Sequence, residues 1–595
     1  MSNTTEEDQT HLLLKKRATL TAALQSEPYD LITYIQRAQV HADLGYPDLA
    51  VGDYYRALLL TDEVANEGFE YHEQAVEALR EQCRSGEGNG EGEAWQVPEM
   101  LKWKGDYKDR SEGLGEMPKS GDINGGFTNG EESSEAGSKE EGRRELIVRL
   151  ASIKCYRGLA LNLLLCGCLK SAYDFCLRGL AIAKDDGYWK HRKDYILLMA
   201  KRRLKVDEVD ISSLPDQGVV RREAYPWNTH EPDRFSQESL DTLSKELSVC
   251  APKLEVRVTE LPILLEAYKE SDNFGITPTI KQLGLFAKED IEPGEEILHE
   301  ISLLAANNLL KESLCDACSS SLPGLSMDSE VVACPDCDDI MFCNQECLSL
   351  AQESYHPAVC DKDLDTIAKD PDPAEKPFAL YLLLLGRALA MSETQSIHPL
   401  DLKEVKYIWG DFLPSSVNAV PLSPSSEPPP IWTLPFSFAG NVSGPLHLLE
   451  KMEIDVFASI DSYDLWIFNT LYAKFRGTAS ARVNKKTGHP EVAAVHPLWC
   501  LANHDCDPNV SWEWGARMKF WCRTARIGGK KGGVRKGEEI LNHYTDVELK
   551  VKERREWALG SLGGFCMCDR CKREAGDFGG WGSMMGDIDG ICGTV

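Results

Sequence analysis

Eight residues of metal-binding type lie within one segment of 46 residues. Their spacing is C-x2-C-x15-C-x2-C-x5-C-x3-C-x8-H-x3-C, and they are Cys315, Cys318, Cys334, Cys337, Cys343, Cys347, His356 and Cys360. Zn²⁺ is held by four thiolate or imidazole ligands in a tetrahedron, and a two-residue gap lets one tight turn supply two of them. Eight ligands therefore predict two zinc ions. A segment this short has little core of its own, so metal binding would supply much of its folding free energy.

A second group of cysteines lies near the end of the chain. Cys566, Cys568 and Cys571 form C-x-C-x2-C, which is one thiolate short of a tetrahedral zinc site. The stretch "LANHDCDPNV" offers Cys506 as the fourth ligand. The other chemistry open to Cys506 is that of a nucleophile activated by His504. We favour the ligand, because nothing nearby supplies a partner to orient the histidine or a glycine turn to stabilise an oxyanion.

The elements expected to position these residues are short strands and apolar helices. Residues 281–300, "KQLGLFAKEDIEPGEEILHE", have the pattern of short strands separated by a Pro-Gly turn. Residues 537–546, "GEEILNHYTD", contain an apolar strand that ends in Tyr544. The stretches that begin at Phe378 and Ser462 have the apolar pattern of helices. The C-terminal half is therefore predicted to be α+β.

Two stretches of the N-terminal part match at five positions of the same spacing, four of which are Ala or Gly in both. With offsets of 7, 12, 16 and 19, they are Ala38, Gly45, Ala50, Tyr54 and Ala57, then Ala160, Gly167, Ala172, Cys176 and Gly179. Small residues recur in this way where two antiparallel helices approach closely, and the pattern resembles tetratricopeptide repeats. An unrelated pair of helical hairpins is the other interpretation.

Three segments are not expected to form helices or sheets. Residues 84–143 are rich in Gly, Glu and Ser, and such a segment cannot bury enough apolar surface to offset its chain entropy. This predicts a disordered insertion. The stretch "LPSSVNAVPLSPSSEPPPIW" from Leu413 has too many prolines for a helix or a sheet interior, which predicts a loop. The Gly-rich tail from about Gly576 is expected to be loose.

Composition and charge exclude several classes of protein. The net charge is −30, so we expect no direct binding of nucleic acid or of an anionic membrane, whereas a basic substrate would suit the charge. The longest apolar runs, Leu159–Leu169 and Phe378–Leu385, are shorter than the roughly 20 residues of a membrane span. The start, "MSNTTEEDQT", has no secretory signal, which predicts an intracellular protein, cytoplasmic or nuclear. In such a reducing compartment, 20 cysteines indicate metal binding rather than disulfides.

The order of the eight ligands resembles that of the MYND finger, in which the chain holds two zinc ions by alternate pairs. By position, the resemblance implies that one ion is bound by Cys315, Cys318, Cys343 and Cys347, and the other by Cys334, Cys337, His356 and Cys360. Both would be closed structural sites without an open position for catalysis. Such fingers contact proline-containing peptides or pack on their host domain, and both roles stay open.

Four motifs around the finger resemble, in the correct order, the split SET domain and post-SET zinc site of protein-lysine methyltransferases. They are "GLFAKEDIEPGE" from Gly284, "NHDC" from Asn503, "GEEILNHY" to Tyr544, and C-x-C-x2-C. With the embedded finger, this arrangement resembles the SET-and-MYND family over roughly residues 255–572. The implied fold class is α+β, with a SET-domain β-fold that is interrupted by a MYND zinc finger and a helical insert. A post-SET zinc site follows this fold, and an all-α tetratricopeptide-like region precedes it.

The resemblance, the repeats and the composition together predict ten regions. They are a helical, tetratricopeptide-like region, 1–83; the acidic disordered insertion, 84–143; a second helical, tetratricopeptide-like region, 144–204; a linker, 205–254; the SET N-terminal part, 255–314; the MYND finger, 315–360; a helical SET insert with a Pro-rich loop, 361–475; the SET catalytic part, 476–550; the post-SET zinc region, 551–572; and a Gly-rich tail, 573–595.

The resemblance also implies roles for individual residues. Asn503 and His504 would line the pocket of S-adenosylmethionine, by side-chain amide and backbone contacts respectively, and Tyr544 would be the catalytic residue beside the transferred methyl group. Gly284 matches the second glycine of the cofactor loop, where the lack of a side chain lets the backbone approach the cofactor. The full set implied at the cofactor is Gly284, Leu285, Asn503, His504, Tyr544 and Phe565. A third zinc ion would be held by Cys506, Cys566, Cys568 and Cys571.

Two positions depart from the family pattern. Gln282 stands where the cofactor loop usually has its first glycine, and Asp505 stands where the usual Asn-His-Ser-Cys has serine. The retained Asn503, His504 and Tyr544 favour an S-adenosylmethionine-dependent methyltransferase that acts on lysines of histones or other proteins. Gln282 favours the alternative, a catalytically inactive zinc scaffold for protein–protein interaction. Peptide partners are expected through the repeats or the finger.

Overall fold

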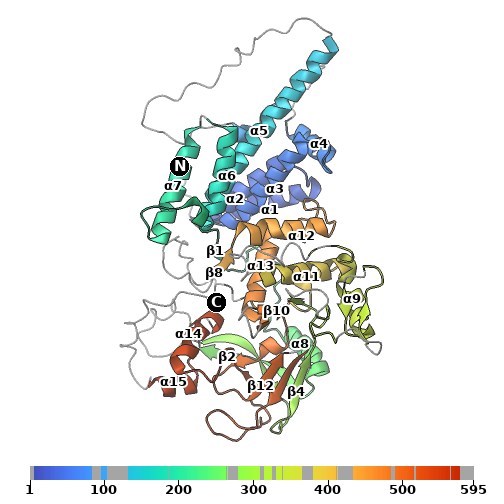
Figure 1. The fold of residues 1–595 in the computed structure, drawn as a ribbon, viewed down its shortest axis with the longest axis vertical. Coiled ribbons are helices and arrows are strands. Elements are labelled where there is room, and N and C mark those ends of the chain that lie inside the picture. The colour runs from blue at the N-terminus through green and yellow to red at the C-terminus, as the bar shows by residue number, and fades with distance from the viewer. Residues whose placement is uncertain are drawn as a thin grey trace.

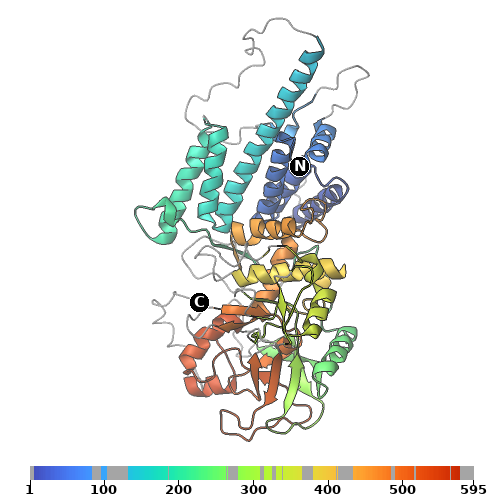
Figure 2. The ribbon, with the colours of Figure 1, turned by 45° about the vertical axis from the view of Figure 1, so that its right-hand side comes forward.

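Helices and strands are segregated along the chain and in space. The computed structural model describes residues 6–83, 95–102, 132–184, 186–262, 264, 279–307, 314–323, 330–337, 340–362, 364, 379–410, 412, 433–483, 490–514, 517–562 and 564–576. The molecule is elongated, with the N-terminal helices at one end and the strands of the C-terminal half at the other (Figure 1). Figure 2 shows the N-terminal helices as a row that extends away from the strand-rich end.

Seven α-helices make up the described N-terminal part. They are α1 (Glu6–Ser26), α2 (Leu31–Asp43), α3 (Pro47–Ala65), α4 (His72–Cys83), α5 (Glu132–Cys166), α6 (Leu169–Ile182) and α7 (Gly187–Leu204), with the short helices η1 (Glu99–Leu101) and η2 (Ile211–Ser213). The two predicted helical hairpins are α2–α3 and α5–α6. Their connecting turns contain Gly45 and Gly167, with φ of 82° and 88°, where glycine adopts the left-handed region without strain. The pairs confirm the hairpins, and their tetratricopeptide identity stays a prediction.

The predicted disordered insertion differs from the structure in part. Residues 84–94 and 103–131 lie outside the described residues. Between them, Trp95 and Leu101 are buried in the core of the helical region, and α5 already begins at Glu132. The prediction rested on the average composition of the segment, which is rich in Gly, Glu and Ser. Two large apolar side chains within it nevertheless bury apolar surface.

The strands of the C-terminal half form several small sheets. Antiparallel pairing joins β2 (Leu254–Pro262) to β3 (Thr279–Ala287), and a second sheet has the order β12 (Val510–Trp514), β13 (Met518–Cys522), β4 (Glu296–Glu300). A third has the order β5 (Ala305–Asn307), β10 (Pro490–Ala494), β9 (Ser480–Val483). The short strands β11 (Asn503–His504) and β14 (Leu541–Asn542) run parallel. The strands predicted within residues 281–300 are confirmed, and Gly294 has a φ of 84° at the turn between them.

Helices lie between the two ends of the molecule and beside the strands (Figure 1). The predicted helices from Phe378 and Ser462 are confirmed as α11 (Ala379–Gln395) and α13 (Leu465–Thr478), with α12 (Gly444–Lys451) between them in the chain. The short helices there are η6 (Pro399–Asp401), η7 (Ala439–Ser443) and η8 (Trp499–Leu501). The cysteine-rich segment contains β6 (Val332–Ala333), β7 (Met341–Phe342), α9 (Gln345–Ser354) and η4 (His356–Ala358). The last helices are α14 (Val551–Leu562) and α15 (Asp569–Ala575).

Two predicted irregular segments cannot be compared with the structure, and a third prediction concerns membrane spans. The Pro-rich loop from Leu413 and the tail beyond Gly576 lie outside the described residues. In the described ranges, no helix has both the length and the apolar character that a membrane crossing requires.

Residues 205–254, predicted as a linker, pack onto the rest of the molecule. Within them, β1 (Gly218–Arg221) pairs antiparallel with β8 (Thr433–Phe436), and α8 (Gln237–Cys250) packs against β2. Tyr225 is buried and stacks on Trp227, with ring centroids 5.3 Å apart. The segment therefore connects the two ends through side-chain packing as well as through the chain.

Buried charges also join the N-terminal helices to the C-terminal half. Arg37 of α2 is 0% exposed, donates to Asp53 of α3 at 2.9 Å through Nε, and has Nη1 3.2 Å from Oδ2 of Asp464, directly before α13. Arg56 of α3 places Nη1 3.6 Å from Asp464 Oδ1 and donates to the carbonyl oxygen of Tyr463 at 2.8 Å. Two arginines from the N-terminal helices thus enclose one carboxylate more than 400 residues away.

Candidate functional site

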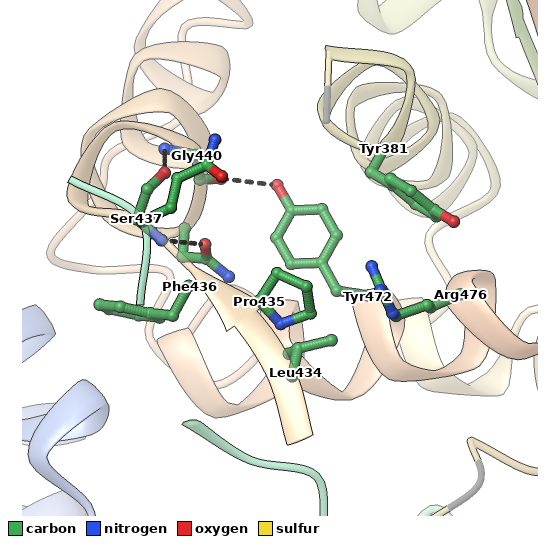
Figure 3. A pocket seen from close by; sticks show the side chains of 10 residues that line it. Tyr381, Leu434, Pro435, Phe436, Ser437, Gly440, Tyr472 and Arg476 are labelled. Atoms are coloured by element: carbon green, nitrogen blue, oxygen red, sulfur yellow. Dashed lines mark hydrogen bonds between the residues drawn. The ribbon is translucent and has the colours of Figure 1, made fainter. Parts of the chain in front are cut away.

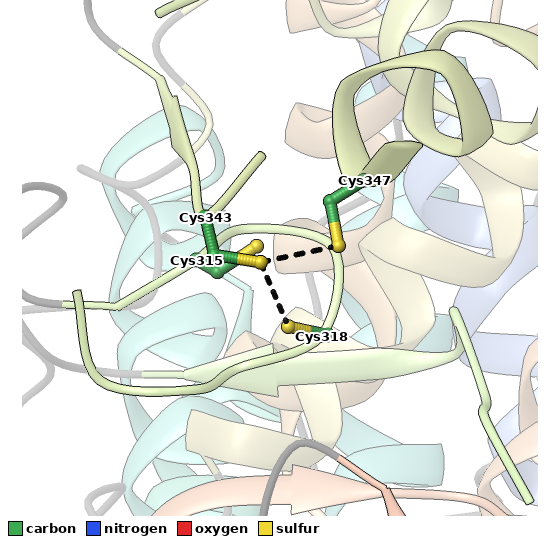
Figure 4. A group of neighbouring side chains, drawn as sticks. All are labelled: Cys315, Cys318, Cys343 and Cys347. Carbon is green, nitrogen blue, oxygen red and sulfur yellow. Dashed lines mark hydrogen bonds between the residues drawn. The ribbon is translucent and has the colours of Figure 1, made fainter. Parts of the chain in front are cut away.

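The first predicted zinc cluster is assembled from three local elements (Figure 4). Its ligand atoms belong to Cys315, Cys318, Cys343 and Cys347, and all lie within 4.8 Å of one another. The Sγ atom of Cys343 is 3.8 Å from that of Cys318 and 3.4 Å from that of Cys347. With Zn–S bonds of about 2.3 Å, the edge of a tetrahedral site is about 3.8 Å. The geometry therefore fits a zinc ion.

The second cluster lies in the same finger and uses the alternate ligands. Cys334, Cys337, His356 and Cys360 are within 4.8 Å of one another. His356 Nε2 is 3.1 Å from Cys334 Sγ and 3.7 Å from Cys337 Sγ, and Cys334 Sγ is 3.8 Å from Cys360 Sγ. This cluster could also hold zinc, with the alternation that the resemblance implies.

A third cluster joins two segments that are about sixty residues apart. Cys506, Cys566, Cys568 and Cys571 form a group within 4.8 Å, and Cys506 Sγ is 3.8 Å from Cys566 Sγ and 3.4 Å from Cys571 Sγ. Arg570 of α15 donates through Nη1 to the carbonyl oxygens of Cys506 and Val547, at 2.7 and 2.9 Å. The structure thus brings Cys506 to the three thiolates as predicted, and the group could hold zinc.

The turn that carries Cys506 also contacts Tyr544. His504 Nδ1 accepts a hydrogen bond from the backbone N–H of Tyr544 at 3.0 Å, and its Nε2 is 3.3 Å from Cys506 Sγ. Burial lowers the pKa of His504 to about 4, which favours the neutral ring. Because Cys506 is 0% exposed among three other thiolates, the interpretation of Cys506 and His504 as a nucleophile and its base is not supported.

Asp505, to which the sequence assigned no role, closes the same turn. Its Oδ1 accepts the backbone N–H of Asp507 at 2.7 Å, and its own N–H donates to the carbonyl oxygen of Asn542 at 2.8 Å. Such a side chain-to-backbone bond two residues ahead is the usual use of aspartate in a turn. Asp505 therefore holds the backbone between the Asn-His pair and Cys506.

The predicted cofactor loop is a regular strand whose last part is buried. Gln282 lies opposite Thr259 in an unbroken β2–β3 register, so the missing first glycine is accommodated as an ordinary strand residue. Leu285 is 0% exposed and its carbonyl oxygen accepts the N–H of Ile540 at 2.8 Å. A side chain at Gly284 would have its Cβ 2.6 Å from an Oε1 atom, that of Glu539.

The remaining predicted site residues lie at the edges of this region. The hydroxyl of Tyr544 donates to the carbonyl oxygen of Ala502 at 2.9 Å, and its ring centroid is 5.3 Å from that of His504. Both side chains are partly exposed. Phe565 is partly exposed and directly precedes Cys566. Asn503, His504 and Tyr544 are thus brought together, whereas Phe565 lies beside Cys566, at the third cysteine cluster.

Glu300, which the sequence did not single out, supports the segment before Asn503. Its carboxylate accepts the backbone N–H groups of Leu498 and Trp499, at 3.0 and 2.7 Å, around the start of η8. Burial raises the pKa of Glu300 to about 7, while the two N–H groups act in the opposite direction. No local pattern marks this role, because the acceptor and the helix are separated by almost 200 residues.

Replacement of Glu300 with glutamine is expected to change the pH dependence of stability. A carboxyl whose folded pKa lies above its unfolded value contributes stability that is full below the unfolded pKa, near 4.5, and is lost as pH rises through the folded pKa, near 7. The advantage of the unmodified protein over Glu300→Gln should therefore shrink by about 1 kcal/mol between pH 6 and 8. Thermal unfolding of both proteins at both pH values measures this, and a constant difference would contradict it.

A fourth group of metal-binding type does not have the geometry of a zinc site. His230, His398 and Asp401 lie within 4.8 Å, but the two imidazole rings are stacked 3.7 Å apart with an interplanar angle of 6°. Ring nitrogens bind a metal in the plane of the ring, so parallel stacked rings cannot both direct a lone pair at one ion. His230 Nδ1 instead contacts Asp401 Oδ2 at 2.7 Å.

A cavity lies away from all the predicted site residues (Figure 3). It is open to solvent and bounded by β8, α11 and α13, with Pro435, Tyr381, Tyr472 and Arg476 around it. The Tyr472 hydroxyl donates to the carbonyl oxygen of Gly440 at 2.8 Å. Its lining is mainly apolar and includes neither a predicted zinc ligand nor a predicted cofactor residue.

Known proteins resemble part of this chain. The SET domain family model matches residues 282–545. The histone-lysine N-methyltransferases SET5 of Vanderwaltozyma polyspora and Schizosaccharomyces pombe are 34% identical over 74 and 73 residues, and that of Yarrowia lipolytica is 30% identical over 99 residues. These segments cover 12, 12 and 16% of this chain, and 14, 21 and 20% of the respective relatives. Residues 282–545, which bring together Asn503, His504 and Tyr544, therefore match the SET domain, and the chain is similar in part to histone-lysine methyltransferases.

Proposed function

We propose that this protein is an S-adenosylmethionine-dependent protein-lysine N-methyltransferase whose SET domain is split around a zinc-binding MYND finger. The observation that carries the proposal is the parallel pairing of β11 with β14, with the hydrogen bond from the Tyr544 N–H to His504 Nδ1. Together they join Asn503, His504 and Tyr544 inside the residues that match the SET domain. We propose the domain boundaries predicted from the sequence, except that residues 95–102, α5 from Glu132 and residues 205–254 belong to the packed parts of the molecule. We also propose that the tetratricopeptide-like N-terminal region binds peptide partners.

The proposed reaction needs little acid–base chemistry from the protein. Methyl transfer from a sulfonium to an amine is an in-line displacement, so the protein has chiefly to align the nitrogen, the methyl carbon and the sulfur. The lysine must arrive neutral, and a desolvated channel lowers its pKa. We assign Tyr544 to orientation at this channel, because its ring is fixed by the bond from its hydroxyl to Ala502 and by its backbone bond to His504.

Histone lysines are the substrate class that we propose. The relatives are described as histone-lysine N-methyltransferases, although only a short segment of each is matched. The net charge of −30 would favour the approach of a strongly basic protein, since complementary charge raises the rate of encounter. A non-histone protein with a lysine in a basic segment would satisfy the same argument.

The test is transfer of labelled methyl groups by the purified protein. Incubation with labelled S-adenosylmethionine and either core histones or a whole-cell protein extract should label protein. Tyr544→Phe and Asn503→Ala should each lower the rate by about 100-fold, because each removes a group that orients a reactant. Tyr472→Phe is a matched control, since it also loses a hydroxyl that donates to a backbone carbonyl, but outside this site.

The absence of label above background in every fraction, together with no cofactor binding by calorimetry, would contradict the proposal. An equal loss of rate in Tyr472→Phe and Tyr544→Phe would contradict the role of Tyr544 alone, because the effect would then be one on folding. The first result, in a protein that remains folded, would favour the inactive scaffold that the sequence left as the alternative.

A further inference from the structure

Glu539 occupies a place at the candidate cofactor site that the sequence did not predict. It lies in the segment before β14 and forms an isolated antiparallel bridge with Phe286 of β3. Its Oε1 accepts a hydrogen bond from Asn503 Nδ2 at 2.8 Å and is the atom that a Cβ at Gly284 would meet at 2.6 Å. The glycine therefore leaves room for a carboxylate of this chain, in contact with the asparagine.

This contact fixes the orientation of the Asn503 amide. Asn503 Nδ2 donates both to Glu539 Oε1 and to the carbonyl oxygen of Leu283, at 2.8 and 3.0 Å. The Leu283 carbonyl can only accept, and so can Glu539 in its charged form, so they use the two N–H bonds of the amide and exclude the flipped orientation. The amide oxygen must then point the other way, and no described residue donates a hydrogen bond to it.

In the described residues, this corner presents the Asn503 amide oxygen and the Glu539 carboxylate, while the donors there, the Asn503 amide and the Thr259 side chain, are bonded within the chain. The Glu539 side chain is partly exposed, and burial raises its pKa, while Asn503 and Thr259 stabilise its charged form. An amide oxygen beside a carboxylate attracts a cation that can donate hydrogen bonds and repels a carboxylate. S-adenosylmethionine has two cationic groups, and of these only the ammonium of its amino-acid part carries N–H donors.

We infer that Glu539 is a positioning residue that turns the Asn503 amide oxygen toward the ammonium group of the cofactor and adds negative charge beside it. The inference rests on the proposed function and names which end of the cofactor faces Asn503. The neighbouring Glu538 has a different partner and is given no such role: its Oε1 is 3.3 Å from Arg526 Nη2.

Calorimetry with three compounds tests the inference. S-adenosylmethionine and S-adenosylhomocysteine both carry the ammonium, whereas 5′-methylthioadenosine lacks the whole amino-acid part. Glu539→Ala should raise the Kd of the first two compounds by about 10- to 100-fold, as expected for loss of charge-assisted hydrogen bonding, and leave that of 5′-methylthioadenosine within about twofold. Glu539→Gln keeps an acceptor for Asn503 but not the charge. It should raise the Kd of S-adenosylmethionine and S-adenosylhomocysteine by about fivefold and leave that of 5′-methylthioadenosine unchanged.

The control is Glu538→Ala, which should bind all three compounds as the unmodified protein does. Thermal unfolding and zinc content, measured on each variant, report on folding. An equal loss of affinity for all three compounds in Glu539→Ala would show a role in folding alone and would overturn the inference. Unchanged affinity for all three would overturn it as well. If the unmodified protein binds none of them, the proposed function itself fails, and the inference fails with it.

Discussion

Replacing Cys506 with serine is expected to lower the zinc content from three ions per chain to two and to weaken the binding of S-adenosylmethionine by about tenfold or more. Cys506 is the one ligand of its cluster that comes from the turn with Asn503 and His504. A serine hydroxyl is a poor substitute for a thiolate, and structural zinc supplies much of the order around its ligands. Elemental analysis of the purified protein and calorimetry with the cofactor measure the two effects.

A matched control for this experiment is Cys500→Ser. Cys500 lies six residues earlier, outside the three zinc-competent clusters, and its Sγ donates to the carbonyl oxygen of Pro497 at 3.2 Å, which a serine hydroxyl can also do. This variant should keep three zinc ions and bind the cofactor normally. Two ions in the unmodified protein, or three in Cys506→Ser, would contradict the shared site.

The three cysteine-containing clusters were predictable because the ligands of a metal site follow spacing rules that are visible in the sequence. Two ligands that share a tight turn need a fixed spacing, so the cysteine pairs of the finger are visible without coordinates. Cys506 could be assigned from a count of ligands, since three thiolates lack a fourth. The structure brings each of these residues to its expected cluster, while the identity of the finger as a MYND finger remains our proposal.

The polar contacts around the candidate cofactor site were not predictable in the same way. Glu539 and Glu300 are two among 95 acidic residues, and the groups they contact are 36 and almost 200 residues away. A single glutamate has no spacing rule that marks it as an acceptor for an amide or for a helix start. Asp505 was noticed only as a departure from a pattern, and its role in the turn became clear from the backbone.

The positions of single helices and strands along the chain were predictable, whereas the packing of these elements against one another was not. Apolar periodicity located α11, α13 and the strands of residues 281–300, because side-chain burial repeats along each element. The docking of the N-terminal helices on α13 depends on partners about 400 residues apart, which no local pattern relates to each other. Trp95, Tyr225 and Trp227 pack within the predicted insertion and linker although the composition around them is polar.

This docking makes Asp464 a residue whose loss should be costly. Asp464→Ala is expected to destabilise the fold by about 3–5 kcal/mol, because it leaves Arg37 and Arg56 buried with one partner fewer. Asp53 cannot replace it: burial by itself would raise the pKa of Asp53, but Arg37 and His41 hold it well below its usual value, so its charge is already engaged. Thermal and urea unfolding, followed by limited proteolysis, should show the N-terminal helices released first.

Arg80→Ala provides the comparison for a charge pair of the same helical region at the surface. Arg80 and Glu77 lie one turn apart on α4 and are 38 and 51% exposed, so their pair should contribute no more than about 1 kcal/mol. If Asp464→Ala and Arg80→Ala unfold at the same temperature, the buried charges do not hold the two ends together. A large loss of stability confined to Asp464→Ala would instead mean that the buried charges hold the helical region to the SET-matching region, since the carboxylate belongs to one and both arginines to the other.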